Sequence, residues 1–79
     1  MTKLKIRLAT IEDVKYFVSI ATKFNCEIDV VSNRYVVDAK SIMGLFSLDL
    51  SQPLTLKINS SDEVVTNDIK ECLNQFVAD

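Results

Sequence analysis

Residues 27–48 of the chain read EIDVVSNRYVVDAKSIMGLFSL, and this stretch decides the fold. Residues 27–31 and 34–39 are rich in β-branched side chains, and Ser32-Asn33 between them suits a tight turn because Asn tolerates a positive φ. They predict a hairpin of two antiparallel strands. Residues 41–48 are short and hydrophobic and begin with a serine that suits a helix N-cap. A short helix that follows a strand edge directly argues against a ferredoxin-like arrangement of the same elements.

The segments on either side of this stretch show clear periodicity. Residues 3–8 alternate lysine or arginine with leucine or isoleucine, which predicts a half-buried strand. From residue 10 to about residue 25 the hydrophobic side chains, beginning with Ile11, recur at three- and four-residue steps and predict a helix. After Pro53, residues 54–59 alternate again. A final helix follows, and Ser60 with Glu63 three residues later is interpreted as its capping box.

The resulting order, β-α-β-β-α-β-α, predicts an α+β fold in one domain that spans residues 1–79. We expect an open-faced two-layer sandwich, in which a four-stranded antiparallel sheet carries the helices on one face. The side chains expected to be buried between the helices and the sheet are Val14, Phe17, Val18, Phe24, Ile69, Leu73 and Phe76.

The charge and the residue counts argue against several classes of function. The formal net charge of −2 provides no positive field for nucleic acid, and no apolar segment is long enough to span a membrane. The N-terminal residues lack the apolar stretch of a secretory signal, so a cytoplasmic protein is expected. The chain contains no histidine, and Cys26 and Cys72 are far apart, which predicts two reduced, buried thiols, no metal site and no cofactor.

Two segments resemble a known family. Residues 21–28, ATKFNCEI, and residues 38–48, DAKSIMGLFSL, are similar in sequence and spacing to HPr, the phosphocarrier family of the bacterial sugar phosphotransferase system. The resemblance covers nearly the whole chain and implies the HPr fold. In this family the KSIMG run surrounds a regulatory serine that a dedicated kinase phosphorylates, and Ser41 falls on that serine. Lys40 matches a family lysine, and Ile42 and Met43 match the surface that docks the kinase and transcriptional partners.

The motif that carries the phosphoryl group in the family is missing. A count back from residue 21 without gaps places Thr10 on the phosphocarrier histidine, Glu12 on the arginine and Asp13 on the proline. Glu12 in place of an arginine replaces bidentate phosphate recognition with a like charge that repels the incoming group. A plain helix cap is therefore the favoured interpretation of Thr10.

The interpretation that follows is an HPr-like regulatory protein-binding module, without enzymatic activity, controlled by phosphorylation at Ser41. It is similar to the catabolite-repression HPr-like protein in lacking the histidine. The resemblance implies two partners, a serine kinase of the HPr kinase/phosphorylase type and a transcriptional or metabolic regulator. Two alternatives remain open: a phosphotransferase component with an unrecognised phosphoacceptor, and a structural or oligomerising domain with no phosphorylation, in which Ser41 is only an N-cap. Leu45 and Phe46 are expected to pack in the core.

Overall fold

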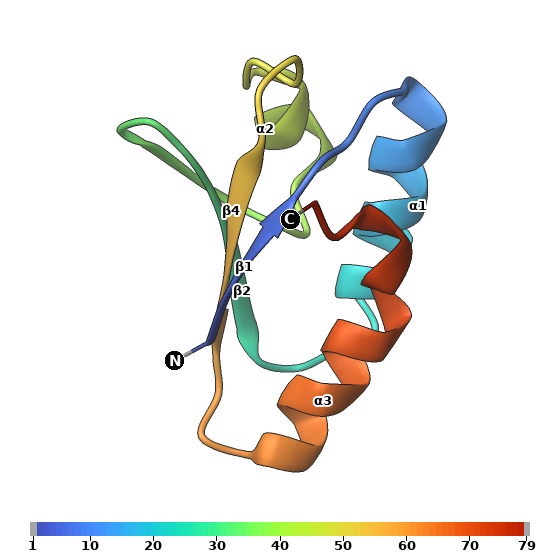
Figure 1. The fold of residues 1–79 in the computed structure, drawn as a ribbon, viewed down its shortest axis with the longest axis vertical. Helices are drawn as coiled ribbons and strands as arrows, with labels where there is room; N and C mark the ends of the chain where they lie inside the picture. The colour runs from blue at the N-terminus through green and yellow to red at the C-terminus, as the bar shows by residue number, and fades with distance from the viewer. Residues whose placement is uncertain (1, 79) are drawn as a thin grey trace.

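The computed structural model describes residues 2–78. The expected domain spans residues 1–79, and its two end residues, Met1 and Asp79, lie outside the described range. Figure 1 shows a sheet that carries helices on one face, and the predicted order of elements is confirmed. The elements are β1 (Thr2–Ile6), α1 (Ile11–Ala21), β2 (Glu27–Ser32), β3 (Tyr35–Asp38), α2 (Ile42–Phe46), β4 (Leu54–Asn59), α3 (Glu63–Cys72) and a short 3₁₀ helix, η1 (Asn74–Phe76).

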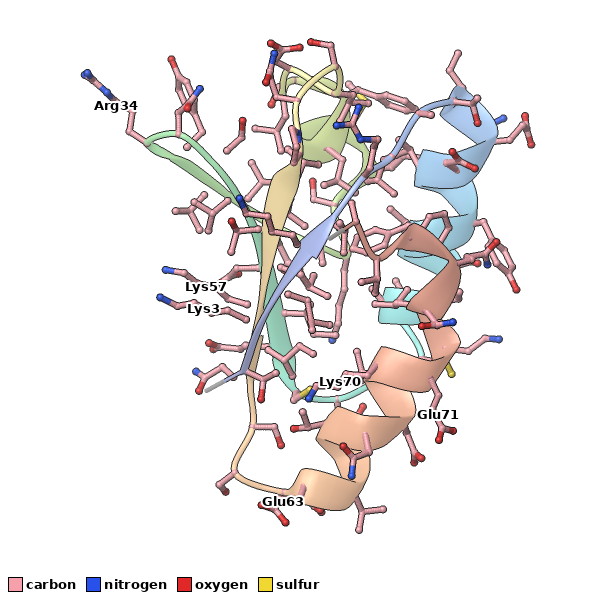
Figure 2. All side chains as sticks on the ribbon, viewed as in Figure 1. Lys3, Arg34, Lys57, Glu63, Lys70 and Glu71 are labelled. Carbon is pink, nitrogen blue, oxygen red and sulfur yellow. The ribbon has the colours of Figure 1, made fainter. Side chains whose placement is uncertain are left out.

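The four strands form one antiparallel sheet in the order β1-β4-β2-β3. The register pairs Leu4 with Leu56 and Leu56 with Val30, so hydrophobic side chains line the face that α1 and α3 cover. The opposite face is uncovered, and Lys3 and Lys57 point outward from it (Figure 2).

The core between the helices and the sheet contains most of the expected side chains. Phe17 of α1 packs edge-on against Phe76 of η1, with ring centroids 5.9 Å apart, and this contact joins the first and last helical segments. Val18 and Phe24 are only partly buried. The remaining expected core residues are fully or almost fully buried: Val14, Phe17, Ile69, Leu73 and Phe76.

The end of α1 differs from the prediction. The helix stops at Ala21 instead of near Asn25, because Lys23 and Phe24 bond to carbonyls only three residues back, at 3.0 and 3.2 Å, and so tighten the last turn. At the other end of α1, Ile11 is 62% exposed, so the apolar face of the helix begins at Val14 and not at Ile11.

The hairpin and the short helix are also shifted relative to the prediction. The turn is Asn33-Arg34 and not Ser32-Asn33, because Ser32 already pairs with Tyr35 in the ladder. Asn33 has the expected positive φ, 55°. Helix α2 covers residues 42–46 only, since the serines at positions 41 and 47 serve as its caps.

Helix α3 begins at a different cap from the one predicted. Asp62 is the N-cap, and its Oδ1 accepts hydrogen bonds from Val64 N at 3.0 Å and from Val65 N at 3.5 Å. Ser60 lies two residues earlier, and its Oγ accepts a hydrogen bond from Asp62 N at 3.1 Å. A carboxylate is a stronger acceptor than a hydroxyl at the positive end of a helix, which explains why the later residue caps it.

The prediction of two buried thiols is wrong, because Cys72 is exposed and Cys26 is only half-buried. The buried stripe of α3 runs instead through Thr66 and Ile69 and continues to Leu73 just after the helix. Within residues 2–78, no helix is both long enough and apolar enough to cross a membrane.

Candidate functional site

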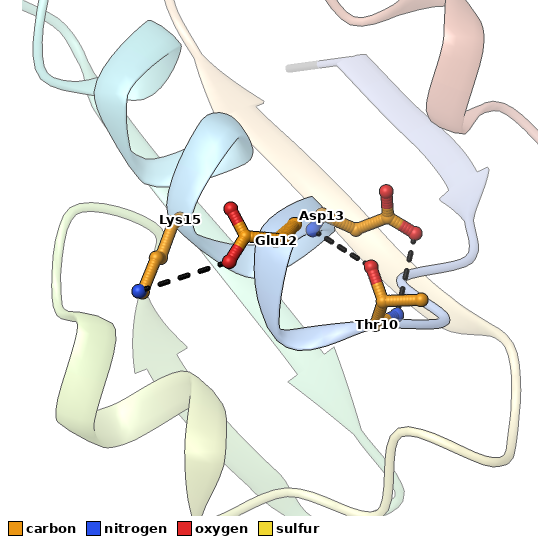
Figure 3. A network of polar contacts seen from close by, with 4 residues as sticks. All are labelled: Thr10, Glu12, Asp13 and Lys15. Atoms are coloured by element: carbon orange, nitrogen blue, oxygen red, sulfur yellow. Dashed lines mark hydrogen bonds and ion pairs between the residues drawn. The ribbon is translucent and has the colours of Figure 1, made fainter.

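The start of α1 is closed by its own side chains. Thr10 is the N-cap, and its Oγ1 accepts a hydrogen bond from Asp13 N at 3.0 Å. In return, Asp13 Oδ2 accepts a hydrogen bond from Thr10 N at 3.3 Å (Figure 3). It also accepts one from Ala9 N at 3.1 Å. This reciprocal pair is a capping box. Thr10 therefore acts as a helix cap in this structure.

The electrostatics of this turn oppose an incoming anion. Backbone N–H groups at a helix start can hold a phosphate. Here the side chain of Asp13 already accepts from the N–H groups of Ala9 and Thr10, just before the helix, and Thr10 Oγ1 accepts from that of Asp13. Glu12 adds a second carboxylate, which is exposed and lies 3.9 Å from Lys15 Nζ (Figure 3). A phosphoryl group at this position would meet two like charges, and Lys15, the cation paired with Glu12, is itself exposed.

The start of α2 has a different character. Ser41 is exposed and forms the N-cap with φ −99° and ψ 103°, and its Oγ accepts a hydrogen bond from Gly44 N at 3.1 Å. The backbone N of Ser41 donates to Asp38 O at 2.9 Å, which ties the cap to the end of β3. The hydroxyl is thus held at the surface by the backbone on both sides of it.

Gly44 permits this arrangement through its size. A Cβ at position 44 would lie 3.1 Å from Ser41 Oγ and 3.2 Å from Val37 Cβ, both closer than ordinary carbon contacts. The φ of Gly44 is not positive, so the glycine is needed for the close approach and not for its conformational freedom. A glycine three residues after Ser41 is therefore part of what allows the N-cap hydrogen bond to form.

Large hydrophobic side chains are exposed on α1 and α2, two helices that contact each other. Met43 is 78% exposed, Ile11 62% and Phe46 41%, whereas Leu45 is buried and Ile42 is half-buried. The core interpretation therefore holds for Leu45 and is wrong for Phe46. Sequence reasoning missed Ile11 and Phe46 as surface residues, although the excess of hydrophobic side chains in so short a helix was a signal for one of them.

Lys40 makes a specific contact inside the molecule. Its Nζ donates a 2.6 Å hydrogen bond to the carbonyl oxygen of Phe24, and its backbone N donates to Asp38 Oδ1 at 2.9 Å. The half-buried lysine thus joins the loop after α1 to the loop before α2. Its ammonium is already used in the fold, which sequence reasoning did not anticipate.

The predicted site residues fall into two groups. Thr10 and Glu12 lie at the start of α1, and residues 40–43 lie at the start of α2. Beyond them, in the loop after α2, the hydroxyl and the backbone N–H of Ser51 donate to Asp49 and lower the pKa of its carboxyl. Among the described residues, no three His, Cys, Asp or Glu side chains gather in a way that would hold a metal ion.

Known proteins of one family share this sequence pattern and fold. The family model described as "PTS HPr component phosphorylation site" matches residues 12–78, a match that begins two residues after Thr10. Among solved structures, HPr-C-His from Thermoanaerobacter tengcongensis is 26% identical, with a TM-score of 0.75, over 95% of this chain and 93% of that one.

Two further structures show the same fold at lower identity. The histidine-containing phosphocarrier protein of Mycoplasma is 17% identical, with a TM-score of 0.71, over 94% of this chain and 93% of that one. Crh, the catabolite repression containing protein of Bacillus subtilis, is 23% identical, with a TM-score of 0.65, over 94% of this chain and 88% of that one. No curated protein sequence matches the chain significantly. The family match over most of the chain, together with the shared fold, shows that the chain belongs to the HPr family of the phosphotransferase system.

Proposed function

We propose that this chain is a regulatory, protein-binding member of the HPr family, controlled by phosphorylation of Ser41, and not a relay of phosphoryl groups. The observation that carries the proposal is the absence of histidine from the 79 residues. The closed capping box of Thr10 and Asp13 supports it, because the start of α1 is already occupied by a carboxylate.

The chemistry of phosphoryl transfer gives the reason. Such transfer depends on positioning and on cations or donors that stabilise negative charge. At the start of α1 the chain supplies carboxylates at positions 12 and 13 instead. A phosphate ester on Thr10 would also lack the transfer potential of a phosphohistidine, so it would be a poor relay.

Ser41 is the acceptor that the geometry favours. Its hydroxyl is exposed, and it adjoins backbone N–H groups of the first turn of α2. A phosphoserine would add about −1.5 to −2 charge beside the exposed side chain of Met43. A partner with an arginine and an apolar groove could read both features at once.

The proposed partners act in the cytoplasm. They are a serine kinase of the HPr kinase/phosphorylase type and a transcriptional or metabolic regulator that binds through Ile42, Met43 and the exposed Phe46. Lys40 contributes by holding the loop that presents them, since its ammonium bonds to Phe24 O. The proposal is supported by the shared fold of Crh, which is described as a catabolite repression containing protein.

The first test is kinase labelling followed by intact-mass measurement. The wild type should gain one phosphate, and Ser41→Ala should gain none. Ser47→Ala is the matched control, because Ser47 is exposed on the same helix but caps its C-terminal end, where its hydroxyl donates to Gly44 O. Phosphate on Ser47 alone, or unchanged labelling of Ser41→Ala, would reject the assignment and favour a purely structural domain.

The second test is labelling driven by phosphoenolpyruvate and the first enzyme of the phosphotransferase system. The wild type should remain unlabelled, which separates the proposal from a transferase with an unrecognised acceptor. Thr10→His with Glu12→Arg should be labelled faster than Thr10→His alone, because the single variant keeps the carboxylate of Glu12 beside the acceptor. Efficient labelling of the single variant would show that the carboxylates matter less than their position suggests.

A further inference from the structure

The uncovered face of the sheet has its charges separated by sign. Side chains alternate between the two faces of each strand, and those of the hydrophobic face are buried under the helices. The two strands β1 and β4 place only basic charges on the uncovered face, and β2 and β3 place only acidic ones. The basic side chains are Lys3, Lys5 and Lys57, and the acidic ones are Glu27, Asp29 and Asp38.

The register aligns four of these charges in a single row across the sheet. Lys3 pairs with Lys57, Lys57 with Asp29, and Asp29 with Asp38. The row therefore reads basic, basic, acidic, acidic from β1 to β3. Like charges directly opposite each other disfavour the pairing of their strands. Sheet stability alone would favour alternating signs, so it does not account for this order.

These charges form no close ion pairs with one another in residues 2–78. Two of the acidic side chains accept hydrogen bonds from neutral donors: Asp38 Oδ1 from Lys40 N at 2.9 Å and Glu27 Oε2 from Asn59 Nδ2 at 3.4 Å. Lys3 and Lys57 point away from the helices and from the rest of the chain (Figure 2). The face is therefore open to a partner that carries the same row in the reverse order.

A second copy of this chain carries such a row. When two sheets face each other about a two-fold axis parallel to the strands, β1 of one copy lies opposite β3 of the other, and β4 lies opposite β2. Lys3 then faces Asp38, and Lys57 faces Asp29, twice in each dimer. A two-fold axis across the strands would place lysine on lysine instead. We propose that the uncovered sheet face is a self-association surface, and that the two-fold axis of the dimer runs parallel to the strands.

The neighbouring row fits the same arrangement. It contains Lys5, Thr55, Val31 and Val36 in strand order, and Val36 is 59% exposed. In the proposed dimer the alkyl chain of Lys5 covers Val36, and Thr55 lies over Val31. Lysine commonly packs its carbon chain on apolar surface while its ammonium stays in water.

The size of the face determines the strength that we expect. With strands about 4.8 Å apart and about 3.3 Å per residue, the face measures roughly 20 by 17 Å. Two such faces bury well under the roughly 1,200 Å² that stable complexes need. The dimer should therefore be weak, form only at high protein concentration, and weaken with salt as exposed charges are screened.

The test uses two charge reversals, alone and mixed. Lys57→Glu and Asp29→Lys each place like charges opposite each other twice in the homodimer, so each should raise the dissociation constant by at least about tenfold, or 1.4 kcal/mol. An equimolar mixture of the two variants should associate again, because the introduced glutamate of one variant then faces the introduced lysine of the other. Lys23→Glu, at an exposed position just after α1, is the matched control for net charge and should dimerise like the wild type.

Association is measured by sedimentation equilibrium and by the concentration dependence of amide chemical shifts, at low and high salt. The spectrum of each variant at low concentration shows whether it is folded. Recovery in the mixture supports the proposal, because a merely destabilised variant would not regain association from another one. A monomeric wild type at millimolar concentration and low salt would overturn it, as would a dimer that both single variants retain, including one formed by strand exchange. The proposal is independent of Ser41, so these outcomes leave the proposed regulation untouched.

Discussion

Gly44→Ala is expected to destabilise the protein, although helix propensity alone predicts the opposite. Alanine in place of glycine inside a helix is favoured by about 1 kcal/mol. In this structure the added Cβ would lie 3.1 Å from Ser41 Oγ and 3.2 Å from Val37 Cβ. Val37 belongs to β3 and moves only with the sheet, whereas Ser41 Oγ can rotate away and lose its hydrogen bond from Gly44 N.

The expected magnitude follows from these opposing effects. Crowding of a packed site costs about 1–3 kcal/mol, and the loss of an N-cap hydrogen bond costs about 1 kcal/mol. Set against the gain of about 1 kcal/mol in propensity, the free energy of unfolding should fall by roughly 1–3 kcal/mol. In a domain of this length that corresponds to a melting temperature lower by about 4–8 °C for each kcal/mol.

Chemical and thermal denaturation of four proteins test this reasoning: the wild type, Gly44→Ala, Ser41→Ala and the double variant. Ser41→Ala removes one of the two crowding contacts and the cap, so Gly44→Ala should cost less in that background by about 0.5 kcal/mol or more. A stabilised Gly44→Ala protein, or an equal cost in both backgrounds, would show that the backbone of α2 relaxes and that position 44 does not constrain the serine.

Two further pairs of substitutions test contacts that only the structure shows. Asp62→Ala should lower the free energy of unfolding by about 1 kcal/mol, because Asp62 is the N-cap of α3, and Ser60→Ala should lower it by clearly less. Urea denaturation measures both values. A larger loss for Ser60→Ala would indicate that Ser60 is the more important cap, as the sequence predicted. Lys40→Met should cost about 1–3 kcal/mol, because it leaves Phe24 O without its donor, whereas Lys23→Met at an exposed position should be nearly neutral. Equal stabilities of the two lysine variants would indicate that water replaces the Lys40 ammonium.

Much of the fold could be predicted from local patterns. Period-two alternation marked β1 and β4, three- and four-residue steps marked α1 and α3, and all the elements are where the patterns placed them to within a few residues. The errors lie at the ends of elements. There, several residues can cap the same backbone groups, as Ser60 and Asp62 can at α3. Which residue becomes the N-cap depends on the backbone conformation just before the helix.

The candidate site was predictable as residue identities but not as contacts. Ser41 was expected to cap a helix, and it does. The exposure of Ile11 and Phe46 was not expected, since a hydrophobic side chain in an amphipathic pattern is usually assigned to the core. The bond from Lys40 to Phe24 O joins residues 16 positions apart, beyond the range of any local pattern.

The sequence by itself determined the order of elements, the lack of histidine and the acidic first turn of α1, because each of these is a property of consecutive residues. Only the tertiary structure decided which strands are neighbours. The order β1-β4-β2-β3 brings Lys57 between Lys3 and Asp29, and so separates the charges of the uncovered face by sign. Strand order results from packing between segments tens of residues apart, and no local periodicity specifies it.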